Sequence, residues 1–408
     1  MAIEDGRVVE IGPALRGRAP REIDAARLHI FPGGIDSHVH FNEPGRTDWE
    51  TIAHGSRALA AGGYTCFIDM PLNSLPVTVD AAAFDLKRAA LERSAVVDFG
   101  LWGGLVPGNV KHLGELVDRG VLGFKAFMCP SGVDEFPACD EATLRRGMAR
   151  IVELGVPLLV HAEDPRLLRP PDGPSPADFI RSRPAAAELE AIRRVIELAA
   201  DTGCRTHIVH VSTAAGLQLI LAAAQGGVPV SCETCPHYLL YGAGDVERLG
   251  GLAKCAPPFR TAADREGLWD TLAGASPVIV VSDHSPSSPE LKTGDDFRQI
   301  WGGISGCQST RQLLLAEDRL PLARVAALTS TNVAARFRVE GKGGLAPGYD
   351  ADLWLVDLAH EDVVRHGDLL YRHPQSAHEG RRIRGRTVLT LVRGEWPGRG
   401  RLIRAGER

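Results

Sequence analysis

Six ionisable residues fall at the ends of short apolar segments: His38, His40, Lys125, His161, His210 and Asp283. Imidazole and carboxylate groups are ligands for Zn²⁺, Co²⁺, Mn²⁺ and Fe²⁺. A single buried histidine is usually a hydrogen-bonded core residue, but in His38-Val39-His40 the strand period of two points both rings to one side. Burying this many polar side chains without a cation would be costly. The set therefore predicts a metal site.

Lys125 is the unusual member of this set, because an ammonium group repels a metal ion. It lies in the apolar run Gly123–Met128, where desolvation should lower its pKa. A neutral amine can react with CO₂ to give a carbamate, and the two oxygens of a carbamate can bridge two metal ions. The alternative is an ordinary strand lysine that snorkels or forms an ion pair.

Two metal ions that share a hydroxide would generate a nucleophile at neutral pH and polarise a carbonyl. Asp283 would bind one ion, accept the proton of the hydroxide and pass it to a leaving nitrogen. This chemistry suits the hydrolysis of an unreactive amide.

The elements that must position these residues are short apolar strands separated by amphipathic helices. The expected strands are Gly34–His40, Tyr64–Met70, Val96–Gly103, Val121–Met128, Pro157–His161, Thr206–Val211, Val228–Glu233 and Val278–Asp283. The expected helices include Trp49–Ala61, Ala81–Glu92, Glu141–Leu154, Ala185–Ala200 and Ala214–Ala224. This alternation predicts an α/β fold, a (β/α)₈ TIM-like barrel whose strands all end at one mouth. A doubly wound open sheet is the alternative, but no G-x-G-x-x-G follows a strand.

The two ends of the chain differ from the barrel pattern. Strand-like segments occur at Ile3–Ile11, Arg21–Leu28, Asp352–Leu358 and Arg386–Gly394. They predict a small composite β-sandwich made from both termini, with residues 1–29 and 338–408 in the sandwich and 30–337 in the barrel. Three Pro/Gly-rich loops, Pro71–Pro76, Cys129–Ala138 and Ala162–Arg183, follow strands and are expected to cover the site.

Composition excludes several classes of partner. With 46 basic and 51 acidic residues the net charge is −5, so there is no basic excess for nucleic acid. The sequence has no apolar run long enough to span a membrane and no signal-like N-terminus, so we expect a cytoplasmic protein.

The eight cysteines are then expected as reduced thiols. Cys232, Cys235 and His237 invite a zinc-knuckle interpretation, but a second pair is missing, and a buried strand explains Cys232 equally well.

Together, five motifs resemble the amidohydrolase superfamily, and within it the cyclic amidohydrolases. They are Pro32–His40, Gly123–Lys125, Val160–Glu163, His207–Thr213 and Ser282–Pro286, and the resemblance runs from about Gly6 to Arg393. It implies two divalent metal ions per chain, Zn²⁺ before Co²⁺, Mn²⁺ or Fe²⁺, bound by His38, His40, carboxylated Lys125, His161, His210 and Asp283. It also implies that His210 rather than His207 is the ligand, and that the chain forms a homotetramer or dimer. Relatives carry about one further strand before Glu4, so a truncated N-terminal share of the sandwich is expected.

The choice among cyclic amides depends on local patterns. Dihydroorotases read a substrate carboxylate with three groups, in place of which this chain has Asn42, Ala256 and Ser287. An amide such as Asn42 cannot neutralise a carboxylate. Hydantoinases usually place a tyrosine after the lysine strand, and the loop from Cys129 to Val133 has none.

The stretches around the site instead resemble those of allantoinases. They are Asn42–Glu50, Asp69–Ser74, Phe124–Pro137, Glu233–Tyr238, Lys254–Arg260 and Ser282–Ser287. The substrate implied is allantoin, which is neutral and rich in amide groups, so hydrogen-bonding side chains such as Asn73, Ser285 and Ser287 are expected around it. A dihydroorotase or a hydantoinase/dihydropyrimidinase-type enzyme is the alternative. A non-catalytic scaffold is disfavoured because all six ligand residues are present.

Overall fold

The chain folds as a closed parallel barrel in the computed structural model, which describes residues 1–15, 17, 19–274 and 276–407. An eight-stranded sheet runs in sequence order, and the barrel closes where the backbone N–H of His40 donates to the carbonyl of His284 at 2.8 Å. Its strands are β4 (Gly34–Val39), β5 (Tyr64–Asp69), β6 (Asp98–Gly104), β7 (Gly123–Phe127), β8 (Leu158–His161), β9 (Thr206–Ile208), β10 (Val230–Thr234) and β11 (Ile279–Val280). The predicted barrel is confirmed.

Burial on both faces of the sheet explains why the strand sequences are largely apolar. Every residue of β4, β5, β6 and β7 is buried, because the barrel core lies on one side and helices lie on the other.

No helix among the described residues is long and apolar enough to cross a bilayer.

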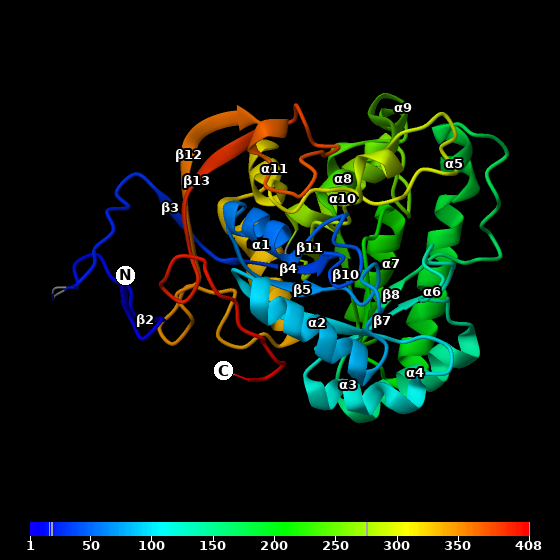
Figure 1. Cartoon of the computed structure of the whole chain (residues 1–408), viewed down its shortest axis with the longest axis horizontal. Coiled ribbons are helices and arrows are strands. Elements are labelled where there is room, and N and C mark those ends of the chain that lie inside the picture. The colour runs from blue at the N-terminus through cyan, green and yellow to red at the C-terminus, as the bar shows by residue number, and fades with distance from the viewer. Residues whose placement is uncertain (16, 18, 275, 408) are drawn as a thin grey trace.

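Helices surround the sheet (Figure 1), and several of them begin at a capping side chain. The side chains of Thr51, Asp80 and Asp140 each accept a hydrogen bond from a backbone N–H in the first turn of the helix that follows. The helices are α1 (Ile52–Ala61), α2 (Ala81–Ser94), α3 (Leu113–Arg119), α4 (Glu141–Leu154), α5 (Pro176–Ser182), α6 (Ala185–Thr202), α7 (Ala214–Gln225), α8 (Pro236–Leu240), α9 (Asp245–Leu249), α10 (Ala262–Ala273), α11 (Thr310–Ala316), α12 (Leu322–Ala326) and α13 (Asn332–Phe337).

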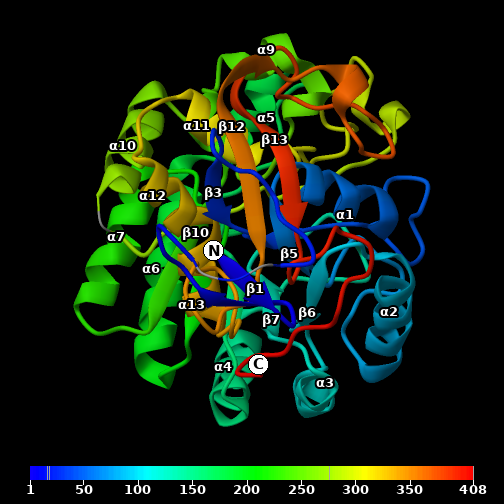
Figure 2. The same cartoon turned by 90° about the vertical axis from the view of Figure 1, so that its left-hand side faces the viewer.

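A second, antiparallel sheet stands beside the barrel and combines strands from the N-terminal and C-terminal parts of the chain (Figures 1 and 2). Strand β12 (Leu353–Val363) pairs with β13 (Arg382–Leu391) on one side and with β3 (His29–Pro32) on the other. Strands β1 (Ala2–Glu4) and β2 (Arg7–Glu10) form a separate hairpin. The composite sheet from both termini is therefore confirmed.

Two strand predictions near the N-terminus are wrong. The segment Ile3–Ile11 is not one strand, because Asp5 and Gly6 take positive φ values of 49° and 78° and turn the chain into the β1–β2 hairpin. The segment Arg21–Leu28 forms no strand in its described residues. Asp24 accepts a hydrogen bond from the N–H of Ala26 at 3.0 Å, a local turn that competes with strand pairing, and the strand begins only at His29.

The C-terminal region also reaches the mouth of the barrel. The N–H of Arg372 donates to Glu50 at 3.1 Å, and Gln375 donates its Nε2 to the carbonyl of Ser287 at 2.9 Å. The ring of Tyr371 lies 4.7 Å from that of His284, which follows Asp283. Residues 371–375 therefore support the segment that carries Asp283.

Candidate metal centre

All six predicted ligand residues line one cavity of about 330 Å³. The strands that end at this mouth supply His38, Lys125 and His161, while His40, His210 and Asp283 lie just beyond strand ends. The parallel barrel therefore brings together residues that are up to 245 positions apart in the chain, as the spacing of His38 and Asp283 shows.

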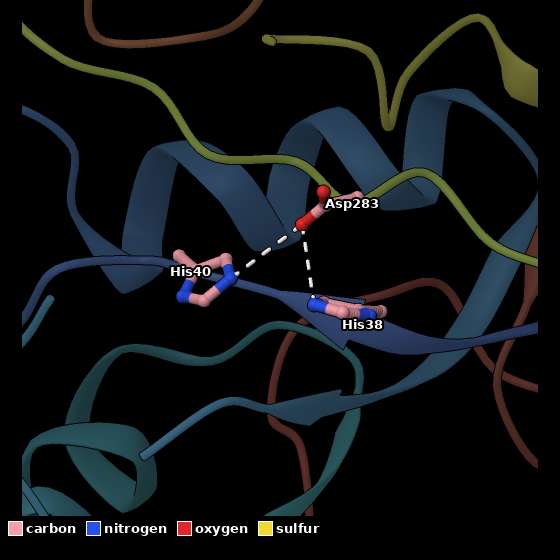
Figure 3. A group of neighbouring side chains, drawn as sticks. All are labelled: His38, His40 and Asp283. Atoms are coloured by element: carbon pink, nitrogen blue, oxygen red, sulfur yellow. Dashed lines mark ion pairs between the residues drawn. The ribbon is translucent and has the colours of Figure 1, made fainter. Parts of the chain in front are cut away.

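The histidine nitrogens face each other and the carboxylate of Asp283 across the cavity. Nε2 of His38 lies 3.2 Å from Oδ1 of Asp283, and Nε2 of His40 lies 3.5 Å from the same oxygen (Figure 3). Nδ1 of His161 lies 3.0 Å from Nε2 of His210. Burial lowers the pKa values of His40, His161 and His210, which favours neutral imidazoles, the form that binds metal. This donor set fits divalent metal ions.

The opposite ring nitrogens are held by partners behind the cavity. Nδ1 of His38 lies 2.5 Å from Oε1 of Glu233, and Nε2 of His161 lies 2.8 Å from Oε2 of Glu163. Nδ1 of His40 faces the carbonyl of Leu72 at 3.4 Å. Carboxylate or carbonyl groups behind histidine ligands are typical of metal sites, because they fix the ring orientation.

Both supporting carboxylates are ionised. Burial favours the protonated acid, but His38 and His207 hold the pKa of Glu233 at about 2. Burial acts the same way on Glu163, and Arg183 with His161 holds its pKa at about 2. Sequence reasoning included both acids in its motifs but gave them no role. The signal was an acid within or just after a buried strand, close to a ligand histidine.

Asp283 follows β11 and has a left-handed backbone conformation, with φ of 46°. Burial raises its pKa, but the neighbouring imidazoles of His38, His40 and His210 outweigh burial and hold the pKa well below the usual range of a carboxyl group. The carboxylate is therefore negatively charged at neutral pH and can bind a cation or accept a proton.

Lys125 lies on β7 with its side chain fully buried. Its Nζ has no hydrogen-bond partner among the described residues and lies 4.9 Å from the centre of the Phe127 ring. Burial lowers the pKa of this amine to about 8, although Glu233 and Asp283 oppose the shift. A buried amine without a partner, beside a cluster of ligands, fits the carbamate chemistry expected from the sequence.

The structure separates the two histidines of the β9 region. His207 lies on β9, does not line the cavity, and is held by Ser231 at 2.7 Å and Glu233 at 3.1 Å. His210 lines the cavity. This placement agrees with the implied choice of His210 as the ligand.

Of the residues expected around the substrate, two line the cavity and one does not. Asn73 and Ser285 line the cavity and are joined by a 3.2 Å hydrogen bond from Nδ2 to Oγ. Ser287 is fully buried and is not among the residues that line this cavity. Asn42 also lies outside the lining and donates its Nδ2 to the carbonyl of Pro286 at 3.0 Å.

Each of the three loops expected to cover the site contributes to the lining: Leu72 and Asn73 from the first, Pro130 to Gly132 from the second, and Phe179 with Arg183 from the third. A fourth wall, residues 298–303, was not predicted. Of the zinc-knuckle candidates, Cys235 and His237 approach Asp283, whereas Cys232 does not join that group in the described part of the chain.

Comparison with known proteins identifies the family. The model of the amidohydrolase family matches residues 29–396. A protein of Rubrobacter xylanophilus named allantoinase is 51% identical, with 97% of this chain and 89% of that protein covered. The allantoinase of Escherichia coli O1:K1 is 39% identical, with 97% and 90% covered. The solved structure of L-hydantoinase (dihydropyrimidinase) from Arthrobacter aurescens matches with a TM-score of 0.94 and 31% identity over 98% of this chain and 94% of that one. The chain therefore belongs to the amidohydrolase family.

Proposed function

We propose that this protein is a metal-dependent hydrolase of cyclic amides that opens the hydantoin ring of allantoin to give allantoate. The observation that carries the reaction type is the convergence of six ligand-type residues on one cavity. The choice of allantoin is supported by the 51% identity to the Rubrobacter allantoinase along 97% of the chain.

The residues that would hold two divalent ions are His38, His40, Lys125 as its carbamate, His161, His210 and Asp283. Zn²⁺ is the first candidate, with Co²⁺, Mn²⁺ and Fe²⁺ as alternatives. When bound, such ions lower the pKa of water and polarise the substrate carbonyl.

The protein residues supply proton transfer and orientation. The Asp283 carboxylate accepts a proton as the water oxygen bonds to the ring carbonyl carbon. The C–N bond of the ring then breaks, and the same proton goes to the leaving nitrogen. Asn73 and Ser285 offer hydrogen bonds to the amide groups of the ring. The second proton of the water is released to solvent when the new carboxylic acid ionises, so the product is an acyclic carboxylate and atoms and charge balance.

Apart from Lys125, which is assigned to the carbamate, the cavity is lined by Arg183, Lys254 and Arg298, and each of these already has partners. Arg183 donates its Nε to Glu163 at 3.2 Å, and Arg298 donates its Nε to Asp296 at 2.8 Å. The Nζ of Lys254 donates to three backbone carbonyls. None of these groups is free to pair with a substrate carboxylate, which favours a neutral ring over dihydroorotate.

A hydantoinase-type activity is the second candidate. It is favoured by the close match in fold to the Arthrobacter L-hydantoinase. Both activities open a hydantoin ring, so they differ in the substituent that the cavity accepts rather than in the chemistry at the metal centre.

The deciding experiment is a comparison of allantoin, hydantoin, dihydrouracil and dihydroorotate with one metal-loaded preparation. Allantoin should give the highest kcat/KM. Elemental analysis of protein purified without chelator should find up to two divalent ions per chain. Asp283→Asn should lower kcat by about 10²–10⁴, and full activity in this variant would contradict the proton transfer.

We also propose a cytoplasmic homotetramer or dimer. All eight cysteines are buried and free, as suits a reducing compartment. The oligomeric state can be measured by light scattering coupled to size exclusion.

A further inference from the structure

Residues 297–303, which we call the roof segment, contain no helix or strand, yet six of them line the metal-centre cavity. Phe297 and Ile300 also line a second cavity of about 590 Å³ on the outer side, together with residues 174–176 and 249–252. The roof segment is therefore a thin wall between two cavities. Phe297 and Ile300 are buried in it, but its backbone has no helix or sheet hydrogen bonds to hold its shape.

Lys254 binds the roof segment from the side of the metal centre. Its Nζ donates to the carbonyls of Phe297 at 2.6 Å, Arg298 at 3.3 Å and Ile300 at 2.5 Å. The three acceptors match the three N–H groups of an ammonium. The same Nζ lies 5.0 Å from the ring centre of Phe179, on α5, and 5.3 Å from that of Phe297.

Lys292 binds the segment from the outer side, where it lines the second cavity. Its Nζ donates to the carbonyl of Trp301 at 3.0 Å and to the carbonyl of Gly303. The two lysines together satisfy five carbonyls of the roof segment. Buried backbone carbonyls outside helices and sheets need such partners.

These lysines differ from the other buried lysines that form ion pairs. Lys87 pairs with Asp69 at 3.1 Å, and Lys342 pairs with Asp98 and Asp352 at 2.7 Å each. In the described part of the chain, neither Lys254 nor Lys292 has a carboxylate within ion-pair distance. Their partners are backbone carbonyls of one short segment.

The N–H groups of the roof segment are tied to fixed parts of the fold. Phe297 donates to the carbonyl of Pro174 at 2.8 Å, Trp301 to that of Leu291 at 2.9 Å, and Gly303 to that of Lys254 at 2.7 Å. The ring of Trp301 also lies 4.9 Å from the ring of Trp49, at the other side of the mouth.

We propose that Lys254 and Lys292 are positioning residues that hold the roof segment closed over the substrate cavity and thereby set substrate affinity. The proposal rests on the proposed ring-opening activity. Without either lysine the segment can relax toward the outer cavity. Substrate binding then weakens, while the six ligand residues, which belong to other elements, keep their places.

The test compares Lys254→Met and Lys292→Met with Lys342→Met and Lys111→Met. Lys342→Met removes a buried lysine whose partners, Asp98, Asp350 and Asp352, lie outside the roof segment, and Lys111→Met removes an exposed one. Hydrogen exchange of a peptide covering residues 289–304 is measured together with kcat, KM and metal content.

We expect exchange in this peptide to accelerate at least about tenfold in the two roof variants and not in the two controls. For the ring-opening substrate, KM should rise about tenfold or more, with kcat changed much less and metal content unchanged. Lys254→Arg, which keeps a cationic donor, should restore part of both effects. If a methionine variant does not fold, Lys254→Gln and Lys292→Gln carry the same comparison.

Unchanged exchange in both roof variants, or a loss of kcat at constant KM, would overturn the proposal. Exchange is measured without substrate, so its result stands even if allantoin is not the substrate. Failure of the wild-type protein to open any ring would count against the proposed function alone.

Discussion

Oε1 of Glu233 lies 2.5 Å from Nδ1 of His38, on the side of the imidazole ring that faces away from the cavity. The same carboxylate binds His207 through its other oxygen at 3.1 Å. One buried acid thus connects a histidine that lines the cavity to a histidine outside it, and its charge orients the ring that is proposed to bind metal.

Replacing this acid should weaken metal binding. Glu233→Gln keeps the size of the side chain but removes the charge that holds His38, so metal affinity should fall about 10–100-fold. Competition with a chelator followed by elemental analysis measures this. Glu153→Gln, at an exposed ion pair with Arg150, is the matched control and should leave affinity unchanged. Equal affinities in both variants would show that Glu233 does not support the ligand.

Lys125→Ala should lose metal and activity, because the buried amine that would carry the carbamate is removed. Short carboxylic acids, which can occupy the vacated space, should restore part of the activity. Lys111→Ala, at an exposed position, controls for loss of a lysine. Metal content and activity are measured with and without added acid. A fully active Lys125→Ala variant would exclude the carbamate.

Allantoin should be preferred to dihydroorotate by at least about 10³ in kcat/KM, because an unpaired buried carboxylate is strongly disfavoured and each 1.36 kcal/mol is tenfold in rate. Asn42→Arg should not create dihydroorotase activity. Asn42 is buried, bonded to Pro286 and outside the cavity lining, so a longer side chain there should lower stability. Steady-state kinetics on both substrates check this. Comparable turnover of the two would reject allantoin as the preferred substrate but keep the hydrolase chemistry.

The two lysines that bind the roof segment, Lys254 and Lys292, predict a pH dependence of stability. Burial lowers the pKa of Lys292 from its ordinary 10.5 to about 7, with Cys255 opposing and Lys254 adding to the shift. Burial, with Arg183 adding and Asp296 opposing, lowers the pKa of Lys254 to about 8. Between pH 7 and 10.5 the unfolded chain therefore binds more protons than the folded one, and stability should rise with pH.

Lys292→Met removes this contribution. The free energy of unfolding of the wild type, relative to this variant, should increase by about 1 kcal/mol per pH unit within that window. Denaturant unfolding at pH 7, 8 and 9 measures the difference, with Lys111→Met as the control. A constant difference across the three pH values would show that Lys292 keeps its proton throughout.

Much of the barrel and of the candidate metal site could be predicted from the sequence. The barrel strands are short, continuous apolar runs, and six ligand-type residues lie at or near their ends. Lys125 was recognisable from charge in an apolar run. The hairpin at Asp5-Gly6 was also within reach, since this dipeptide favours a hairpin turn.

Other features depend on contacts that no local pattern encodes. Glu233 is visible as an acid, but its contact with His38 joins residues 195 positions apart on different strands. The roof segment has no periodicity, and its carbonyls meet Lys254 from 43 to 46 residues away. Ser287 was expected around the substrate, but it is fully buried and is not among the residues that line the cavity.

The bond from Arg372 to Glu50 joins residues 322 positions apart, and β3 pairs with a strand that begins at Leu353. During synthesis the ribosome releases the N-terminal strand long before its partner exists. Glu50 is completely buried in the finished protein, and its carboxylate, which accepts from the neighbouring N–H of Thr51, gains the N–H of Arg372 only when the last tenth of the chain has been made. The mouth of the barrel is thus completed only at the end of translation. A nascent chain that stops short of residue 372 contains the barrel strands but lacks the residues that support the segment carrying Asp283.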